Sequence, residues 1–207
     1  MWKQLLNILF PVKCVGCGRS QDNTLLCPSC GQFLPYNNKD ALPLDHKHFV
    51  LFTYDDRAKK IIAQIKYHKN RELIPFIQKI LLKNAPKIEA DLIIPVPLNP
   101  LRYQERSFNQ AEEFFKLYAE YHNIPLCSDI VYRAKNSQKL AGLSPDERQK
   151  EIVDIFEIWA EKQKLLENKR ILIVDDIITT GSTVKNLAYT IQKHHPASIE
   201  ILGVFRP

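Results

Sequence analysis

Apolar residues along the chain fall either into short continuous runs or into sets spaced three and four residues apart. The continuous runs predict buried strands, and the helical spacing predicts helices with one buried face. Strands are expected at 49–54, 91–97, 130–132, 170–176 and 199–205, with a hairpin strand at 155–159. Helices are expected around 58–65, 74–81, 109–118 and 184–191. Because strands and helices alternate, the pattern predicts an α/β fold with a mostly parallel sheet, whose ligands bind at the carboxyl ends of the strands.

The stretch from 171 to 183, ILIVDDIITTGST, carries the clearest chemical signal. A buried strand runs into Asp175 and Asp176, and a helical pattern starts at Val184. The loop between them consists of small residues: Thr179, Thr180, Gly181, Ser182 and Thr183. Unpaired backbone N–H groups and the helix dipole both favour an anion at such a place, so the stretch predicts a phosphate site. The plainer alternative, two acids that merely end a strand, does not explain the hydroxyl-rich loop.

Four cysteines near the N-terminus form two matched CxxC pairs, each followed directly by glycine: Cys14, Cys17, Cys27 and Cys30. Two such turns can close a tetrahedron of four thiolates, and Gly18 and Gly31 permit the positive φ that each turn is expected to need. The spacing predicts a structural zinc site. Two disulfides are the alternative, and they conflict with the reducing compartment expected below. The fifth cysteine, Cys127, is expected to be an ordinary core residue.

A polar connector over 32–46 separates this cysteine module from the rest of the chain. We therefore expect a helix and a zinc-ribbon module over 1–45 and a second domain over 46–207. Residues 1–10 are apolar but short and have no small-residue cleavage site, so they predict a packing helix and not a signal peptide. No window approaches the ~20 apolar residues of a membrane span, and we expect a cytoplasmic protein without membrane insertion.

The 207 residues are 45% hydrophobic and 25% charged, which is typical of a globular protein. The net charge of +6 is compatible with a phosphate-rich partner and equally with an ordinary soluble protein. Arg102, Arg106 and the basic cluster from Lys66 to Arg71 are candidate contacts for pyrophosphate or nucleic acid. A solvated turn between two helices is the plainer interpretation of that cluster. Further candidates lie in and before a long polar connection over 134–150, namely Arg133, Lys135, Lys139 and Arg148.

The acidic pair and hydroxyl loop resemble the type I phosphoribosyltransferase signature at all thirteen positions from 171 to 183. Neither GxxxxGK[ST] nor GxGxxG occurs in the chain, which argues against P-loop and dinucleotide folds. With the cysteine module, the chain resembles the ComF family (competence protein F, ComFC and GntX-like proteins). Further family-like segments are IKY at 65–67, PVPL at 95–98 and RSFNQA at 106–111. Two segments depart from the family pattern: Ser107 stands where RGFNQA has glycine, and IVDIF at 152–156 replaces N-V-x-G-A-F.

The resemblance implies a type I phosphoribosyltransferase fold with a zinc-ribbon module. It also implies that the loop Thr179–Thr183 holds the 5-phosphate of phosphoribosyl pyrophosphate (PRPP). Asp175 and Asp176 would then face the ribose hydroxyls, directly or through Mg²⁺, as the catalytic pair. A pyrophosphate loop normally offers backbone N–H groups, and Pro95, Pro97 and Pro100 have none. No acidic or aromatic side chain in the sequence indicates a nucleobase pocket.

Three functions follow as hypotheses. The resemblance implies a competence factor that binds single-stranded DNA and aids its uptake or processing in natural transformation, with a ComFA-type helicase as partner. Arg102, Arg106, Lys66 and the rings of Tyr67 and Phe108 would serve that role. The second hypothesis is a Mg²⁺-dependent phosphoribosyltransferase with an unidentified acceptor. The third is a scaffold that senses PRPP or a nucleotide without catalysis, so the sequence leaves open whether the protein is an enzyme.

Overall fold

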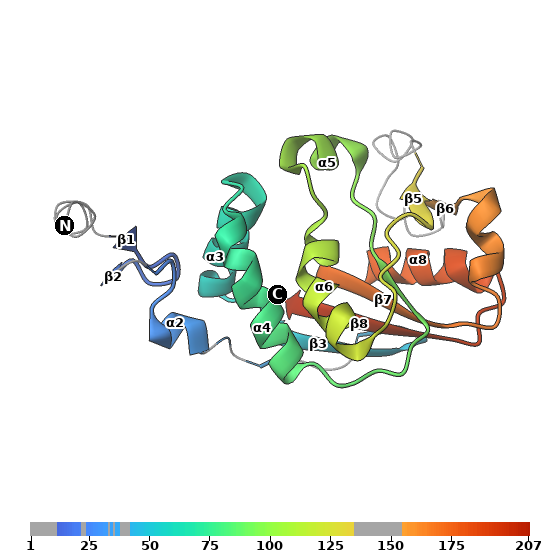
Figure 1. The fold of residues 1–207 in the computed structure, drawn as a ribbon, viewed down its shortest axis with the longest axis horizontal. Coiled ribbons are helices and arrows are strands. Elements are labelled where there is room, and N and C mark those ends of the chain that lie inside the picture. The colour runs from blue at the N-terminus through green and yellow to red at the C-terminus, as the bar shows by residue number, and fades with distance from the viewer. Residues whose placement is uncertain (1–11, 22–23, 33, 35, 38–41, 135–154) are drawn as a thin grey trace.

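The computed structural model describes residues 12–21, 24–32, 34, 36–37, 42–134 and 155–207 (Figure 1). The expected N-terminal helix and the candidates Lys135, Lys139 and Arg148 lie outside the described residues. So do most of the expected long connection and most of the divergent IVDIF segment. No helix in the part of the chain covered by these ranges is long and apolar enough to cross a membrane.

A four-stranded parallel sheet forms the centre of the large domain, in the order β3-β8-β7-β4. The strands are β3 (Lys47–Thr53), β4 (Leu92–Pro95), β7 (Arg170–Ile177) and β8 (Ser198–Arg206). The predicted α/β class and parallel sheet are thus confirmed. The sequence of β7 is a continuous apolar run because other layers of the protein cover both faces of this central strand. Leu172 packs into the core on one face and Ile173 into the core on the other.

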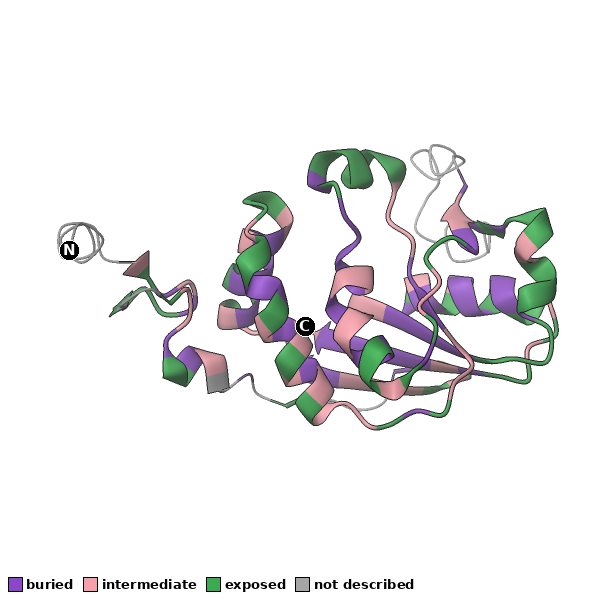
Figure 2. Ribbon diagram, viewed as in Figure 1, coloured by how far each residue is buried: buried purple, intermediate pink, exposed green. Residues whose placement is uncertain are grey.

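One face of the sheet is covered by three helices: α3 (Asp56–Tyr67), α4 (Ile74–Asn84) and α6 (Gln110–His122). A short 3-10 turn, Arg71–Leu73, joins the first two. The other face is covered by α8 (Ser182–Gln192) and by a two-stranded antiparallel ribbon. That ribbon consists of β5 (Val131–Arg133) and β6 (Phe156–Ile158), and the 3-10 helix Ala160–Leu165 follows it. The buried residues line the inner sides of these layers (Figure 2).

A helix that the sequence analysis missed, α5 (Pro100–Arg106), stands above the carboxyl end of the sheet (Figure 1). Proline is tolerated in the first turn of a helix, where its missing N–H has no intrahelical partner anyway. Asn99 caps the helix, since its Oδ1 accepts a bond of 2.9 Å from the Leu101 N–H. The helix ends at Ser107, which is left-handed with φ 68°.

The cysteine module consists of β1 (Val12–Lys13) paired with β2 (Ser20–Gln21) and a short helix, α2 (Pro28–Gln32). Val15, Leu25 and Leu26 pack against the core of the large domain. Within the segment that was expected to be a connector, Leu42 is buried in the second core and Leu44 packs against it. The module and its connector are therefore in contact with the large domain.

Candidate functional site

A polar cavity of about 360 Å³ opens at the carboxyl ends of β4 and β7. It brings together residues far apart in the chain: Lys66, Pro97, Arg102, Arg106, Asn109, Arg133, Asp175, Asp176, Thr179 and Thr183. This is the edge at which a parallel sheet of this kind binds ligands. The candidate groups selected from separate motifs thus meet in one place.

The acidic pair sits at the end of β7 beside a lysine from α3. Lys66 Nζ lies 2.5 Å from Asp176 Oδ2, and both side chains are largely shielded from solvent. The Asp176 N–H donates a 2.8 Å bond to Asp175 Oδ1. Burial and the neighbouring carboxylate of Asp176 raise the pKa of Asp175 well above its ordinary value. The pair therefore holds excess negative charge that a cation can relieve, and Lys66 supplies one such cation.

The basic cluster at 66–71 is split between the cavity and the surface of the protein. Lys66 points into the cavity, and Arg71 forms an ion pair with Glu113 at 3.2 Å. The Arg71 guanidinium also lies over the Phe108 ring, 4.9 Å from its centroid. Lys66 falls in the last turn of α3, one residue after the buried Ile65.

The hydroxyl loop turns directly into α8. Gly181 has φ 83°, a left-handed conformation that favours glycine, and a Cβ there would also displace the tip of Leu44, whose Cδ2 would lie 2.9 Å away. Thr180 Oγ1 and Ser182 Oγ share a 2.8 Å hydrogen bond. A hollow of about 20 Å³ lies against the loop and the first turn of the helix. The loop therefore has the dipole, the backbone donors and the hydroxyls that favour a phosphate group.

Three arginines line the same cavity as the acidic pair: Arg102, Arg106 and Arg133. Arg106 is buried, and its Nη1 donates a 2.8 Å bond to Gln110 Oε1. Burial and the nearby charge of Arg102 lower the pKa of Arg133. Among the described residues, neither Arg106 Nε nor Arg133 Nε has a hydrogen-bond partner. Buried donors without partners are costly, and an anion in the cavity would satisfy them.

The prolines of the opposite wall leave few backbone donors, as the sequence predicted. The one N–H between Pro95 and Pro97, that of Val96, bonds to the Val174 carbonyl at 2.9 Å. The Val96 carbonyl accepts a 3.0 Å bond from Asn109 Nδ2. Guanidinium groups therefore supply donors on this side of the cavity where the prolines and Val96 supply none.

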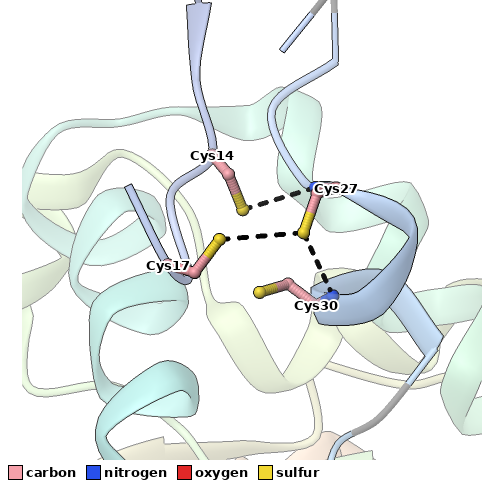
Figure 3. Close-up of side chains that lie close together, drawn as sticks. All are labelled: Cys14, Cys17, Cys27 and Cys30. Atoms are coloured by element: carbon pink, nitrogen blue, oxygen red, sulfur yellow. Dashed lines mark hydrogen bonds between the residues drawn. The ribbon is translucent and has the colours of Figure 1, made fainter. Parts of the chain in front are cut away.

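The four cysteines gather as the spacing predicted, with their Sγ atoms all within 4.8 Å of one another (Figure 3). The Cys17 and Cys27 sulfurs are 3.8 Å apart, which equals the edge of a tetrahedron with Zn–S bonds of about 2.3 Å. Burial acts to raise the pKa of Cys14, but N–H groups led by that of Cys27 outweigh it and lower the pKa to about 6. Burial and the neighbouring thiols, of which Cys27 is the largest contributor, raise the pKa of Cys30 to about 12. Four sulfurs so placed fit a cation that neutralises their charge.

The glycines of this module differ from the expectation in one respect. Gly18 has φ 78°, as predicted. Gly31 lies within α2 and has no positive φ, because its turn continues as a helix. The sequence analysis overlooked Gly16, whose added Cβ would meet Cys30 Sγ at 2.8 Å. The close approach of the two CxxC turns therefore depends on Gly16.

The parallel sheet covered by helices on both faces is the fold expected of type I phosphoribosyltransferases, and comparison with known families agrees with that fold. Residues 110–206 match the model of the phosphoribosyl transferase domain. That segment contains β7, the acidic pair, the hydroxyl loop and α8.

Comparison with individual proteins gives relatives that match most of the chain. The chain is 26% identical to competence protein F of Haemophilus influenzae, over 93% of this chain and 90% of that protein. It is 27% identical to competence protein ComFC of Bacillus subtilis, over 93% of this chain and 77% of that protein. It is 24% identical to the DNA utilization protein YhgH of Escherichia coli, over 91% and 87% of the two chains. These matches, with the clustered cysteines, confirm the resemblance to the ComF family over most of the chain.

Proposed function

We propose that this protein is a ComF-type competence factor that binds single-stranded DNA and aids its uptake or processing in natural transformation. The observation that carries the proposal is the convergence of Arg102, Arg106, Arg133 and Lys66 on one cavity at the carboxyl end of the sheet. The similarity to proteins named for competence and DNA utilization supports the same function. In this proposal a ComFA-type helicase is the partner that delivers or receives the strand, in a reducing cytoplasm.

The chemistry of the cavity favours an unpaired strand. Guanidinium groups bind phosphates well, and those of Arg106 and Arg133 retain donors without partners among the described residues. A cavity of about 360 Å³ takes one nucleotide-sized group and is far too small for a duplex. A strand whose nucleotides can leave the helical stack fits this site.

The test is fluorescence anisotropy of a labelled oligonucleotide titrated with the protein at a series of salt concentrations. We expect binding at low salt that weakens linearly on a logarithmic scale as salt rises, because bound counterions are released. A protein that does not bind at low salt, or whose affinity is independent of salt, would refute the proposal.

A specific observation favours a second function, binding of PRPP with Mg²⁺. Asp175 and Asp176 line the same cavity as the arginines, and two residues separate Asp176 from the start of the hydroxyl loop. Carboxylate oxygens suit Mg²⁺ and ribose hydroxyls, the loop suits a 5-phosphate, and guanidinium groups suit a pyrophosphate. The Lys66 ammonium now at Asp176 would have to share or yield that carboxylate.

Calorimetry with PRPP and Mg²⁺ tests this second function. We expect heat of binding in the wild type and none in a variant carrying both Asp175→Asn and Asp176→Asn. Absence of binding at millimolar PRPP with Mg²⁺ rules the function out. If PRPP binds, a screen of acceptors separates a phosphoribosyltransferase from a sensing scaffold, since only the former releases pyrophosphate.

We further propose that the four cysteines hold one structural zinc ion. The four thiol groups have the chemistry and mutual distances that zinc requires, and no fifth ligand position is needed for a structural role. In this proposal residues 1–45 form the zinc module and residues 46–207 the phosphoribosyltransferase-like domain.

A further inference from the structure

A second, larger cavity adjoins the phosphate site and has a different character. Its volume is about 840 Å³, and it lies between the α5 region and the β5–β6 ribbon. Three aromatic side chains line it: Tyr103, Tyr132 and Trp159. It shares Pro97, Leu98, Asn109 and Arg133 with the phosphate cavity, so the two form one continuous surface. We call this second cavity the aromatic groove.

The aromatic residues of the groove are exposed to an unusual degree. Trp159 is 45% exposed and Tyr103 is 53% exposed. The rings of Tyr132 and Trp159 stack with their centroids 4.2 Å apart and their planes 30° from parallel. The antiparallel pairing of β5 with β6 brings these two rings together from positions 27 residues apart. Trp159 thus remains partly exposed although it stacks on Tyr132, and both residues line the groove.

The charges around the groove separate it from the phosphate cavity. Glu112 and Glu157 line the groove, and Glu157 accepts a hydrogen bond from the Tyr132 hydroxyl. Carboxylates repel a phosphate but accept bonds from the amino groups of bases. On the other side of the shared wall, Arg102 and Arg106 attract phosphate. The surface thus changes from arginine-rich to aromatic and acidic at the shared residue Arg133.

We propose that the aromatic groove binds the bases of single-stranded DNA by stacking on Trp159 and Tyr103, while the adjoining arginines hold the phosphates. This inference rests on the proposed DNA-binding function. It assigns base binding to the aromatic groove, where each base is bound as a flat aromatic ring. Stacking of this kind tolerates any base sequence, because every base has a π-face.

The experiment compares oligo-dT with an abasic strand of the same length and phosphate number. Trp2→Phe leaves Trp159 as the sole tryptophan of the two in the chain, so its emission reports on the groove. Anisotropy of labelled strands measures binding in the same samples. We expect both strands to bind, and only oligo-dT to quench Trp159.

Variants provide the second measurement. Trp159→Ala and Tyr103→Ala should weaken oligo-dT binding about ten-fold each and leave abasic binding unchanged, while Trp159→Phe retains most of the affinity. Arg102→Ala should weaken both strands. Tyr121→Ala is the matched control, since Tyr121 is a helical tyrosine 68% exposed that lies in neither cavity. We expect no change from it.

The outcomes separate the inference from the function beneath it. If both strands bind equally and oligo-dT leaves Trp159 emission unchanged, the groove does not bind bases and the DNA-binding function stands. If Trp159→Ala weakens both strands alike, its effect is structural and the inference is overturned. If neither strand binds the wild type, the proposed function fails and the inference falls with it.

Discussion

At the scale of single residues, the carboxyl edge of the sheet collects groups that are unfavourable in the free protein. Burial and the neighbouring carboxylate of Asp176 raise the pKa of Asp175. Arg106 and Arg133 keep Nε donors without partners among the described residues. Ser107 holds a left-handed backbone without being glycine. Such features gather where a ligand will satisfy them, which is the physical reason to place function at this edge.

Ser107→Gly should stabilise the protein by about 0.5–1 kcal/mol. A left-handed backbone costs a residue with a Cβ about 1–2 kcal/mol, and the greater freedom of glycine in the unfolded chain offsets part of the gain. Asn123→Gly is the matched control, because Asn123 ends α6 with φ 54° and asparagine tolerates that conformation. Urea denaturation measures the free energy of unfolding of both variants. A loss of stability on Ser107→Gly would contradict the expectation.

Asp175→Asn should stabilise the ligand-free protein at neutral pH. The unfolded carboxyl ionises near pH 3.9, and the folded one ionises at higher pH, so stability falls as pH rises through that window. Each unit by which the folded pKa is raised corresponds to about 1.4 kcal/mol. The gain from asparagine should therefore be present at pH 7 and vanish near pH 4.

Asp91→Asn provides a control of opposite sign for this pH dependence. Hydrogen bonds from the Arg170 side chain lower the pKa of Asp91 to about 2. Its stabilising effect is present above pH 3.9 and is lost as pH falls toward 2. In thermal unfolding across pH 3–7, Asp91→Asn should lower the melting temperature at the pH values at which Asp175→Asn raises it. Two variants that respond alike would contradict the assignment of charge at Asp175.

At the scale of secondary-structure elements, tight turns position the site, and glycine at residue 181 is the critical one. Gly181→Ala should destabilise the protein by about 1–3 kcal/mol, since alanine disfavours φ 83° and its Cβ would collide with Leu44. Gly31→Ala is the control: Gly31 is helical, and its nearest neighbour would be Phe76 at 3.8 Å. We expect that variant to be neutral or slightly stabilised in chemical unfolding. Equal effects of both substitutions on stability would show that the backbone conformation at Gly181 does not determine the stability of the loop.

Removal of the metal should unfold the cysteine module and weaken the whole protein. Zinc bound only by the folded state contributes about 4 kcal/mol when its free concentration is 1,000 times its dissociation constant. We expect one zinc per chain by elemental analysis, and a lower melting temperature with a chelator or with Cys30→Ser. Cys127→Ser, outside the cluster, should leave the zinc content unchanged. A metal-free protein of unchanged stability would refute the structural role.

Local patterns predicted the elements, and long-range contacts explain what they missed. The apolar runs located β3, β4, β7 and β8 because both faces of these strands are buried, and helical spacing located α3, α4, α6 and α8. The helix α5 escaped because it is short and its only buried residue is Arg106, so it has no apolar face with helical spacing. The aromatic groove escaped because Tyr132 and Trp159 meet only through the pairing of β5 with β6. The inward side chain of Lys66 depends on the tertiary position of Asp176, which no local pattern contains.

At the scale of the whole molecule, the two ends of the sheet differ in how their charges are matched. At the amino end of β7, Arg170 is held by Asp91 through a contact of 2.7 Å. At the carboxyl end, none of Arg102, Arg106 and Arg133 forms an ion pair with a carboxylate in the described part of the chain. The unmatched positive charge of the described residues near β7 thus faces one side of the protein. We expect single-stranded DNA to bind on that side.

The most direct test of this account is the salt dependence of single-stranded DNA affinity in three proteins: wild type, Arg102→Ala and Arg170→Ala. Both variants lose one guanidinium, and Arg170 lies five residues before Asp175 along β7, about 17 Å away. We predict that Arg102→Ala weakens binding and reduces the slope of log affinity against log salt by about 0.7, while Arg170→Ala leaves the slope unchanged. Equal slopes in all three proteins would contradict the claim that the cavity at the carboxyl edge binds the DNA phosphates.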